Sequence, residues 1–159
     1  PRQSIQNAFS SIDMLLKKLE EKEPGAIILL QFHAATTAEK KTMRFFLDGR
    51  AAAVIGTHTK VITADEMVSS SGLAYITDNG RIGSFMSVGG FDPSTEIKKL
   101  RSQLPVRSQE CWNDGIIEGV LVDIDEESGK SVGIHRIMEH VEITAPGNAN
   151  EADSDNPGK

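Results

Sequence analysis

Hydrophobic residues near the start of the chain recur at intervals of three and four positions between Ser4 and Glu21. They form one apolar stripe, whose members are Ile5, Ala8, Phe9, Ile12, Leu15, Leu16 and Leu19. This period is typical of an amphipathic helix, and Pro24 is expected to end it because proline cannot continue a helix. The stripe predicts a helix packed across a sheet. The alternative is a dimerisation face centred on Leu15 and Leu19.

Three apolar runs follow between Gly25 and Gly56, at residues 26–32, 42–47 and 50–55. The dipeptide Asp48-Gly49 separates the last two runs, and it is a strong hairpin signal because both residues tolerate the positive φ angles of a tight turn. We therefore predict a meander of three antiparallel strands, with a polar connection at residues 34–41. The first run is apolar at odd and even positions alike, which indicates a central strand covered on both faces.

Alanines at three consecutive positions mark the third predicted strand, from Ala51 to Ala53. Alanine is a weak strand former, so its small side chain points to another role here. The run predicts that a helix or a second chain approaches this strand closely.

The second half of the chain carries further signals for helices and hairpins. Thr63 and Glu66 have the spacing of a capping box, which predicts a short helix over residues 64–70. Apolar runs at 73–77 and 81–88 flank a turn at 78–80, and runs at 116–125 and 131–143 flank a turn at 126–130, so two more hairpins are expected. Asp92-Pro93 is a favoured helix start, and that helix is expected to end at Leu104.

Together these elements predict an α+β fold. An antiparallel sheet of hairpins would carry the N-terminal amphipathic helix and one or two further helices. Residues 1–145 are expected to form a single α+β domain. The segment 146–159 is rich in Pro, Gly, Asn, Asp and Ser and is expected to be a disordered acidic tail, because it has too little apolar surface to bury.

Composition narrows the classes of partner. The formal net charge of −6 argues against a nucleic-acid partner. No apolar run approaches the roughly 18 residues of a membrane span, and the N-terminus lacks the order of a signal peptide. The lone Cys111 cannot form an intramolecular disulfide. We therefore expect a cytoplasmic protein without a membrane span or a cofactor.

Two groups of candidate metal ligands fail on geometry. His135 and His140 are five residues apart on a predicted strand, where they would point to opposite faces and could not chelate one ion. Asp123, Asp125 and Glu127 resemble the start of a calcium loop, but the glycine and the bidentate glutamate that should follow are missing. No metal site is predicted.

Two further features are candidates for a nucleophile and for an anion-binding site. Cys111 would be a nucleophile if His33, His58 or His135 met it in space, whereas a single cysteine is more often an inert buried residue. Gly89-Gly90 precedes a helix N-terminus, where an anion could bind, but no phosphate-loop pattern follows and a plain strand-to-helix turn is expected. Basic residues on the predicted helix after Asp92 indicate a solvated face or a surface for an acidic partner; they are Lys98, Lys99 and Arg101.

The segment FFLDGRAAAV resembles the PATAN-type domains of bacterial signalling proteins. Those domains often show a strand of the form aromatic-x-x-Gly-x-x-x-Ala followed by a short helix, and Phe46, Gly49 and Ala53 fill that pattern here. The resemblance covers about residues 4–88. It implies an adaptor that acts by protein contact, and it supplies no catalytic residue.

The sequence thus predicts a non-enzymatic protein–protein interaction module, or adaptor, in a bacterial signalling or motility-type assembly, with protein partners and self-association into a homo-oligomer. No catalytic residue is assigned. Seven residues make up the predicted interaction surface: Leu15, Leu19, Ala51, Ala53, Lys98, Lys99 and Arg101. The alternatives are a small enzyme that uses Cys111 with a histidine, and a structural subunit of a multi-protein complex.

Overall fold

The first helix, α1, spans Ala8–Lys22 in the computed structural model, which describes residues 6–143. It begins after Asn7, whose side chain accepts hydrogen bonds from the amides of Phe9 and Ser10. The amphipathic helix predicted from the apolar stripe is confirmed. The start predicted at Ser4 lies outside the described residues.

A four-stranded sheet follows, built from β1 (Leu29–His33), β2 (Ala53–Thr57), β4 (Ala74–Ile76) and β3 (Met67–Val68), in that spatial order. β1, β2 and β4 are parallel, and β3 pairs antiparallel with β4. β1 is therefore an edge strand, and its residues alternate between exposed and half-buried. The prediction of a central strand covered on both faces is wrong.

The predicted antiparallel meander is also wrong, because its second strand is a helix. Residues Thr37–Leu47 form α2, which connects β1 to β2. Thr36 caps this helix in a full capping box with Glu39. The buried face of α2 includes the polar Lys40, which interrupts the apolar period. The hydrophobicity pattern therefore did not predict a helix here. Asp48-Gly49 ends a helix, and Gly49 uses its positive φ of 75° there.

Two other local predictions fail because residues far away in sequence compete for the same groups. No helix forms at residues 64–70: the Thr63 hydroxyl accepts from the Asp78 amide, and Glu66 pairs with Arg136 of the last strand. The turn at 78–80 does not close a hairpin, because the next strand, β5 (Ile82–Ser84), belongs to a second sheet. Asn79 instead donates from its amide to the carbonyl of Gly56 in β2.

The last two helix and hairpin predictions are confirmed. α3 spans Pro93–Ser102 with Asp92 as its N-cap. β6 (Gly115–Asp125) and β7 (Lys130–Val141) form the long hairpin, which turns at Gly129. With β5 they make a small antiparallel sheet. The α+β class is confirmed, with three helices in the described part of the chain, whereas the main sheet is mostly parallel.

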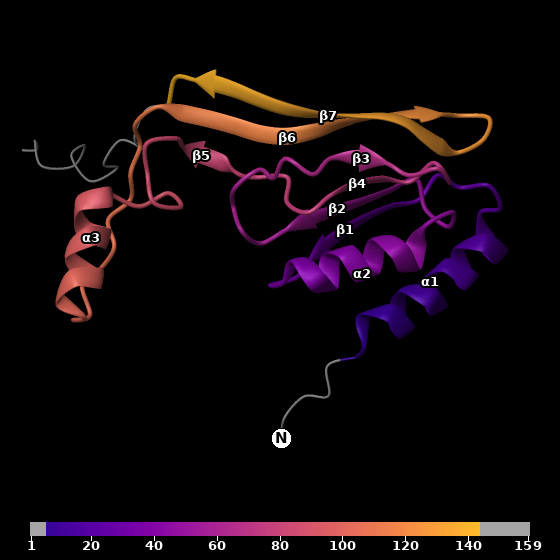
Figure 1. The fold of residues 1–159 in the computed structure, drawn as a ribbon, viewed down its shortest axis with the longest axis horizontal. Coiled ribbons are helices and arrows are strands. Elements are labelled where there is room, and N and C mark those ends of the chain that lie inside the picture. The colour runs from indigo at the N-terminus through magenta and orange to yellow at the C-terminus, as the bar shows by residue number, and fades with distance from the viewer. Residues whose placement is uncertain (1–5, 144–159) are drawn as a thin grey trace, which may run out of the picture. The chain divides into compact units, whose positions relative to one another are not determined.

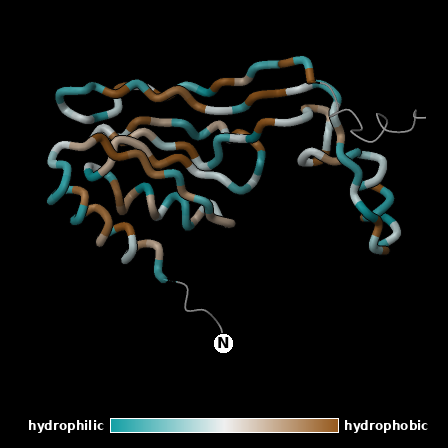
Figure 2. Tube along the Cα trace, turned by 180° about the vertical axis from the view of Figure 1, so that it is seen from behind, coloured by the Kyte–Doolittle hydropathy of each residue, from teal (hydrophilic) through white to brown (hydrophobic). Residues whose placement is uncertain are grey.

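The described residues divide into two compact units. In the first, made of residues up to 81 together with 117–139, the four-stranded sheet lies between two layers. α1 and α2 cover one face, where Leu16, Met43 and Tyr75 are buried. The β6–β7 hairpin covers the other face, where Ile134 packs on Ala53 (Figure 1). Figure 2 shows the alternation of hydrophobic and hydrophilic positions along that hairpin.

The second unit contains β5, α3 and the residues around them, together with residues 140–143. Its loops are joined by backbone hydrogen bonds, among them Asp92 N to Gln109 O at 2.8 Å and Cys111 N to Gly90 O at 2.9 Å. The tail predicted for 146–159 lies outside the described residues. The single domain predicted for residues 1–145 stays a prediction. None of the helices within residues 6–143 is long and apolar enough to cross a membrane.

Candidate active site at the ends of the parallel strands

Two histidines meet where the parallel strands β1 and β2 end. His33 is the last residue of β1, and it lies opposite Thr57, the last residue of β2, in the sheet register. His58 follows Thr57 directly. Ligands of open sheets of this kind bind beyond the carboxyl ends of the strands, so the position itself indicates a site.

The imidazole rings of this pair are oriented by hydrogen bonds. His33 Nδ1 lies 3.0 Å from the Thr57 hydroxyl, and His33 Nε2 lies 3.2 Å from His58 Nδ1. The ring centroids are 5.0 Å apart, with the planes at 76°. Both histidines are exposed to solvent, so a bound molecule can reach their ring nitrogens.

The backbone around His58 departs from ordinary geometry. We call residues 58–62, which leave β2 after Thr57, the strap. Within it His58 has a φ of 128° and Lys60 a φ of 60°, in the region that residues with a side chain rarely adopt. Such conformations persist where surrounding contacts hold them, and they are concentrated at functional sites.

A buried carboxylate holds the strap. Asp78 Oδ2 accepts a hydrogen bond from the Thr59 amide at 2.8 Å and another from Lys40 Nζ at 3.1 Å. Asp78 Oδ1 accepts from the Gly80 amide at 3.1 Å. The side chains of Lys40 and Asp78 are 1% and 0% exposed. Burial alone would raise the pKa of Asp78, but the hydrogen bonds from Thr59, Lys40 and Gly80 outweigh it and lower the pKa.

A second carboxylate, Asp65, joins the segments on either side of β4. Its Oδ1 accepts from the Thr63 hydroxyl at 2.7 Å and from the Thr77 amide at 3.1 Å, and its Oδ2 accepts from the Thr77 hydroxyl. Burial would raise the pKa of Asp65, and the hydrogen bonds from Thr77 and Thr63 reverse that and lower it. The carboxylate is therefore a fixed acceptor at neutral pH.

The histidine pair suits two kinds of chemistry. A neutral imidazole can accept or donate a proton near neutral pH, and it is also the commonest protein ligand of divalent transition metals. Ring nitrogens that converge at 3.2 Å fit two ligands of one ion. Residues 6–143 contain no group of three His, Cys, Asp or Glu side chains that could hold a metal. Further imidazole, thiolate or carboxylate ligands of one ion would have to come from outside the described residues.

The other histidines and Cys111 lie elsewhere. His135 Nε2 is 3.6 Å from Asp123, and the His140 ring packs edge-on against Phe85, so these two do not form a pair. The Cys111 sulfur accepts from the Ser84 hydroxyl at 3.4 Å and lies 3.6 Å from the Met86 carbonyl; neither partner is a histidine.

The turn predicted at 126–130 and the strand-to-helix turn predicted at Gly89-Gly90 both form. Asp125 accepts hydrogen bonds from the amide and hydroxyl of Ser128 inside the β6–β7 turn. Gly89 and Gly90 both have positive φ angles and precede the cap of α3. Asp92 Oδ1 already accepts from the Thr95 amide at that helix start.

The predicted interaction surface is spread over both units. Leu15 and Leu19 are 53% and 39% exposed, whereas Ala53 is fully buried and cannot belong to an exposed surface. The alanines predicted close approach by a helix or a second chain, whereas the neighbour bonded to Ala52 is the strand β7, whose Ser131 hydroxyl donates to the Ala52 carbonyl at 2.7 Å. Ala51 is half-buried against the helices.

The basic residues of this predicted surface lie on α3, and Lys99 contacts Glu96 and Ser108. Lys98 and Arg101 are exposed there. The use of Leu15, Leu19, Ala51 and the three basic residues as an interaction surface stays a prediction.

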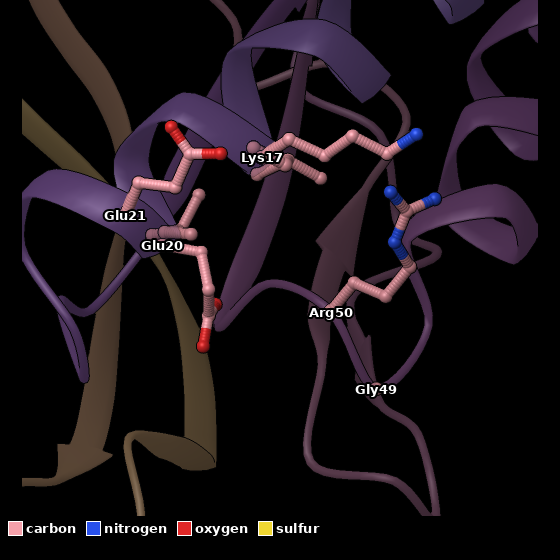
Figure 3. A pocket seen from close by; sticks show the side chains of 7 residues that line it. Lys17, Glu20, Glu21, Gly49 and Arg50 are labelled. Atoms are coloured by element: carbon pink, nitrogen blue, oxygen red, sulfur yellow. The ribbon is translucent and has the colours of Figure 1, made fainter.

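A pocket of about 590 Å³ lies beside the C-terminal half of α1. Figure 3 shows Lys17, Glu20 and Glu21 of α1 on its wall, with Arg50 from the loop after α2. Arg50 also pairs with Asp13 at 2.6 Å. Charges of both signs surround this pocket, so its lining favours neither an anionic nor a cationic ligand.

The family is shown by comparison with known proteins. The model of YmdB-like proteins matches residues 1–137. The chain belongs to the YmdB-like family. It is 39% identical over 134 residues to the 2′,3′-cyclic-nucleotide 2′-phosphodiesterase of Bacillus subtilis, a match that covers 84% of this chain and 50% of that protein. A relative from Mycoplasma pneumoniae is 40% identical over 119 residues, covering 74% of this chain and 42% of the relative. The chain spans about half the length of the curated relatives it matches.

Solved structures agree with this membership. A protein of Thermus thermophilus described as hypothetical has a TM-score of 0.76 at 29% identity, with 87% of this chain and 52% of that chain covered. A protein of Mycoplasma pneumoniae described as a novel phosphatase has a TM-score of 0.77 at 29% identity, with 85% and 47% covered.

These matches correct two expectations. The resemblance to PATAN-type domains is wrong, because the YmdB-like model covers the same residues. The non-enzymatic signalling adaptor is also wrong, because the relatives are named for the hydrolysis of phosphate esters. An enzyme was the alternative, although with Cys111 as nucleophile.

The histidine pair was not predicted because α2 was not predicted. His33 and His58 each follow a short apolar run, a signal that was present in the sequence. A helix between two such runs would have made the strands parallel and brought both of their carboxyl ends, and so both histidines, to one edge.

Proposed function

We propose that this YmdB-like chain contributes His33 and His58 to the active site of a phosphodiesterase that hydrolyses cyclic nucleotide phosphodiesters. The observation that carries the proposal is the convergence of the two imidazoles, 3.2 Å apart, at the carboxyl ends of parallel strands. The B. subtilis relative, which is named a 2′,3′-cyclic-nucleotide 2′-phosphodiesterase, supports the choice of substrate class. A cytoplasmic location is part of the proposal.

The reaction requires proton transfers that suit the pair. Water forms a bond to phosphorus and loses a proton, while the bond from phosphorus to the 2′ oxygen breaks and that oxygen gains a proton. Imidazole is the side chain best suited to take up and return protons at neutral pH. The Thr57 hydroxyl keeps the His33 ring in place, so that its Nε2 faces His58.

A divalent metal ion held by His33 and His58 with further ligands would polarise the phosphate oxygens and lower the pKa of a bound water. With or without a metal ion, the histidines would act at a solvent-exposed edge of the sheet. Because the chain spans about half the length of its curated relatives, the complete activity is a proposal for the whole active site and not for these two residues alone.

The test offers a 2′,3′-cyclic nucleotide to the full chain, with and without added Mn²⁺, and follows ring opening by ³¹P NMR. His33→Ala and His58→Ala are expected to lower the rate by about 100-fold or more, the usual contribution of a proton-transferring or metal-binding group. His135→Ala is the matched control, because His135 is exposed on β7 and pairs with Asp123. Equal losses in all three variants, or a wild-type chain that neither binds nor opens the ring, would contradict the proposal.

The description of a Mycoplasma structure as a phosphatase favours phosphomonoester hydrolysis as a second candidate. The same assay with a nucleoside 3′-monophosphate separates the two. Release of inorganic phosphate from the monoester without ring opening of the cyclic diester would support the second candidate.

A further inference from the structure

Two opposite charges are buried beside the strap in the first unit. Lys40, from α2, and Asp78, which follows β4, are 1% and 0% exposed, and Lys40 Nζ lies 3.1 Å from Asp78 Oδ2. Removing two charges from water is costly, and an apolar pair of similar volume often stabilises a fold at least as well. Stability alone therefore does not account for an ion pair at this position.

The hydrogen bonds of Asp78 indicate what the pair does. Its Oδ2 accepts from the Thr59 amide at 2.8 Å, and Thr59 is the residue between His58 and Lys60. Both neighbours have positive φ angles, 128° and 60°. An unfavourable backbone conformation on each side of Thr59 needs a strong acceptor to hold it, and a charged carboxylate is a stronger acceptor than a neutral group.

Lys40 and Gly80 fix the carboxylate itself. Lys40 Nζ and the Thr59 amide share Oδ2, while the Gly80 amide donates to Oδ1 at 3.1 Å. Each oxygen of Asp78 is thus bonded, and the lysine is anchored on α2, the helix that also connects β1 to β2. The carboxylate has little freedom to move away from the strap.

We propose that Asp78, held in place by Lys40, is a positioning residue that sets the strap conformation and thereby keeps the His58 ring against His33. Asp78 touches Thr59 and not the histidines, so it acts through the backbone of the strap. The inference rests on the proposed function for its catalytic meaning. The dependence of the histidine pair on one hydrogen-bond acceptor can be measured without substrate.

The test compares two double variants that both remove the buried charges. Lys40→Met/Asp78→Asn keeps a carbonyl oxygen that can accept from the Thr59 amide. Lys40→Met/Asp78→Leu has a side chain of similar volume and no acceptor. Neutral replacements of a buried ion pair are commonly tolerated, and urea unfolding establishes first that both variants of the full chain are folded.

Two NMR readouts follow the strap and the histidines. One is the nuclear Overhauser effect between the ring protons of His33 and His58, whose centroids lie 5.0 Å apart. The other is hydrogen exchange at the Thr59 amide. The asparagine variant is expected to retain both properties. The leucine variant is expected to lose the contact between the rings and to exchange the Thr59 amide about tenfold faster, as the loss of one hydrogen bond implies.

A leucine variant that is folded and keeps the wild-type ring contact would overturn the inference and leave the ion pair with a structural role only. A wild-type chain without the ring contact would overturn it as well. If the leucine variant does not fold, Lys40→Met/Asp78→Ala removes the same acceptor with a smaller side chain and is judged by the same readouts.

Failure of this inference is separable from failure of the proposed function. A chain that opens no cyclic nucleotide but loses the ring contact only in the variants without an acceptor refutes the activity and supports the positioning role. A chain whose activity depends on His33 and His58 but whose leucine double variant keeps both the ring contact and the rate refutes the positioning role alone.

Discussion

Gly56 in β2 packs so closely against Thr77 that a Cβ atom on the glycine would lie 1.9 Å from the Thr77 carbonyl oxygen. The Asn79 amide also donates to the Gly56 carbonyl at 3.1 Å. This contact joins the end of β2 to the segment that carries Asp78, and it brings the strap within reach of its buried carboxylate.

Gly56→Ala is expected to destabilise the fold by about 2 kcal/mol or more, because the new methyl group meets backbone atoms that cannot rotate away. Urea unfolding measures the change in the free energy of unfolding. Gly119→Ala in β6 is the matched control, since a Cβ there meets nothing within 4 Å. A stable Gly56→Ala variant would show that β2 and the segment after β4 can separate at little cost.

Thr57→Val should weaken the active site while leaving the fold intact. The valine keeps the shape of the side chain and removes the hydroxyl that lies 3.0 Å from His33 Nδ1. Groups that orient a catalytic or metal-binding histidine are commonly worth about tenfold to 100-fold in activity or affinity, so a loss of that size in ring opening is expected. Thr57→Ser keeps the hydroxyl and is expected to restore most of the rate. Equal losses in the valine and serine variants would assign the effect to packing.

The stability of the first unit should fall in acid because of Asp65. Hydrogen bonds from Thr77 and Thr63 lower the pKa of this carboxyl in the folded chain despite its burial. A folded pKa below the unfolded value of about 3.9 gives stability that is present above that pH and is lost as the pH falls through the folded pKa. Urea unfolding between neutral pH and pH of about 3 should therefore show a decline below about pH 4, and Asp65→Asn should flatten it.

The effect of salt on stability should differ between Asp65 and Asp13. The hydrogen bond and charge of Arg50 lower the pKa of Asp13, whose side chain is 39% exposed. That pair should be screened in about 1 M sodium chloride, where the Debye length is about 3 Å. The partners of Asp65 are hydroxyl and amide groups, so its contribution should survive the salt. Equal sensitivity of Asp13→Asn and Asp65→Asn to salt would contradict this assignment.

Self-association through α1 can now be tested without confusing it with unfolding. Leu15 is 53% exposed, so Leu15→Asp should leave the free energy of unfolding nearly unchanged. If α1 is the dimer face, this variant is monomeric by light scattering at concentrations where the wild-type chain is not. Leu16→Asp is the contrasting variant, because Leu16 is only 8% exposed and belongs to the core. An unchanged oligomeric state in Leu15→Asp would exclude this face.

Elements with a complete local signal were predictable from the sequence. The stripe of α1, the Asp92-Pro93 start of α3 and the long β6–β7 hairpin each follow from residues close together in the chain. The local preferences and the tertiary contacts of these elements agree. Apolar periods and helix-start residues were therefore sufficient to predict them.

The least successful prediction concerned α2, which was expected to be a polar connection and a strand. Its buried face uses Lys40, a charged residue that a hydrophobicity pattern assigns to solvent, and Asp48-Gly49 behind it imitates a hairpin turn. Lys40 is tolerated there only because Asp78, 38 residues later, supplies its partner. No local pattern contains that information.

By itself, the sequence determined the α+β class, the first and third helices, the last hairpin and the positions of four histidines along the chain. Only the tertiary structure decided that β1 and β2 are parallel, that His33 meets His58, and that a buried carboxylate holds the strap that begins at His58. The reason is physical: helix caps and apolar periods act over a few residues, whereas strand direction, burial of a charge and the meeting of two side chains depend on contacts between distant segments.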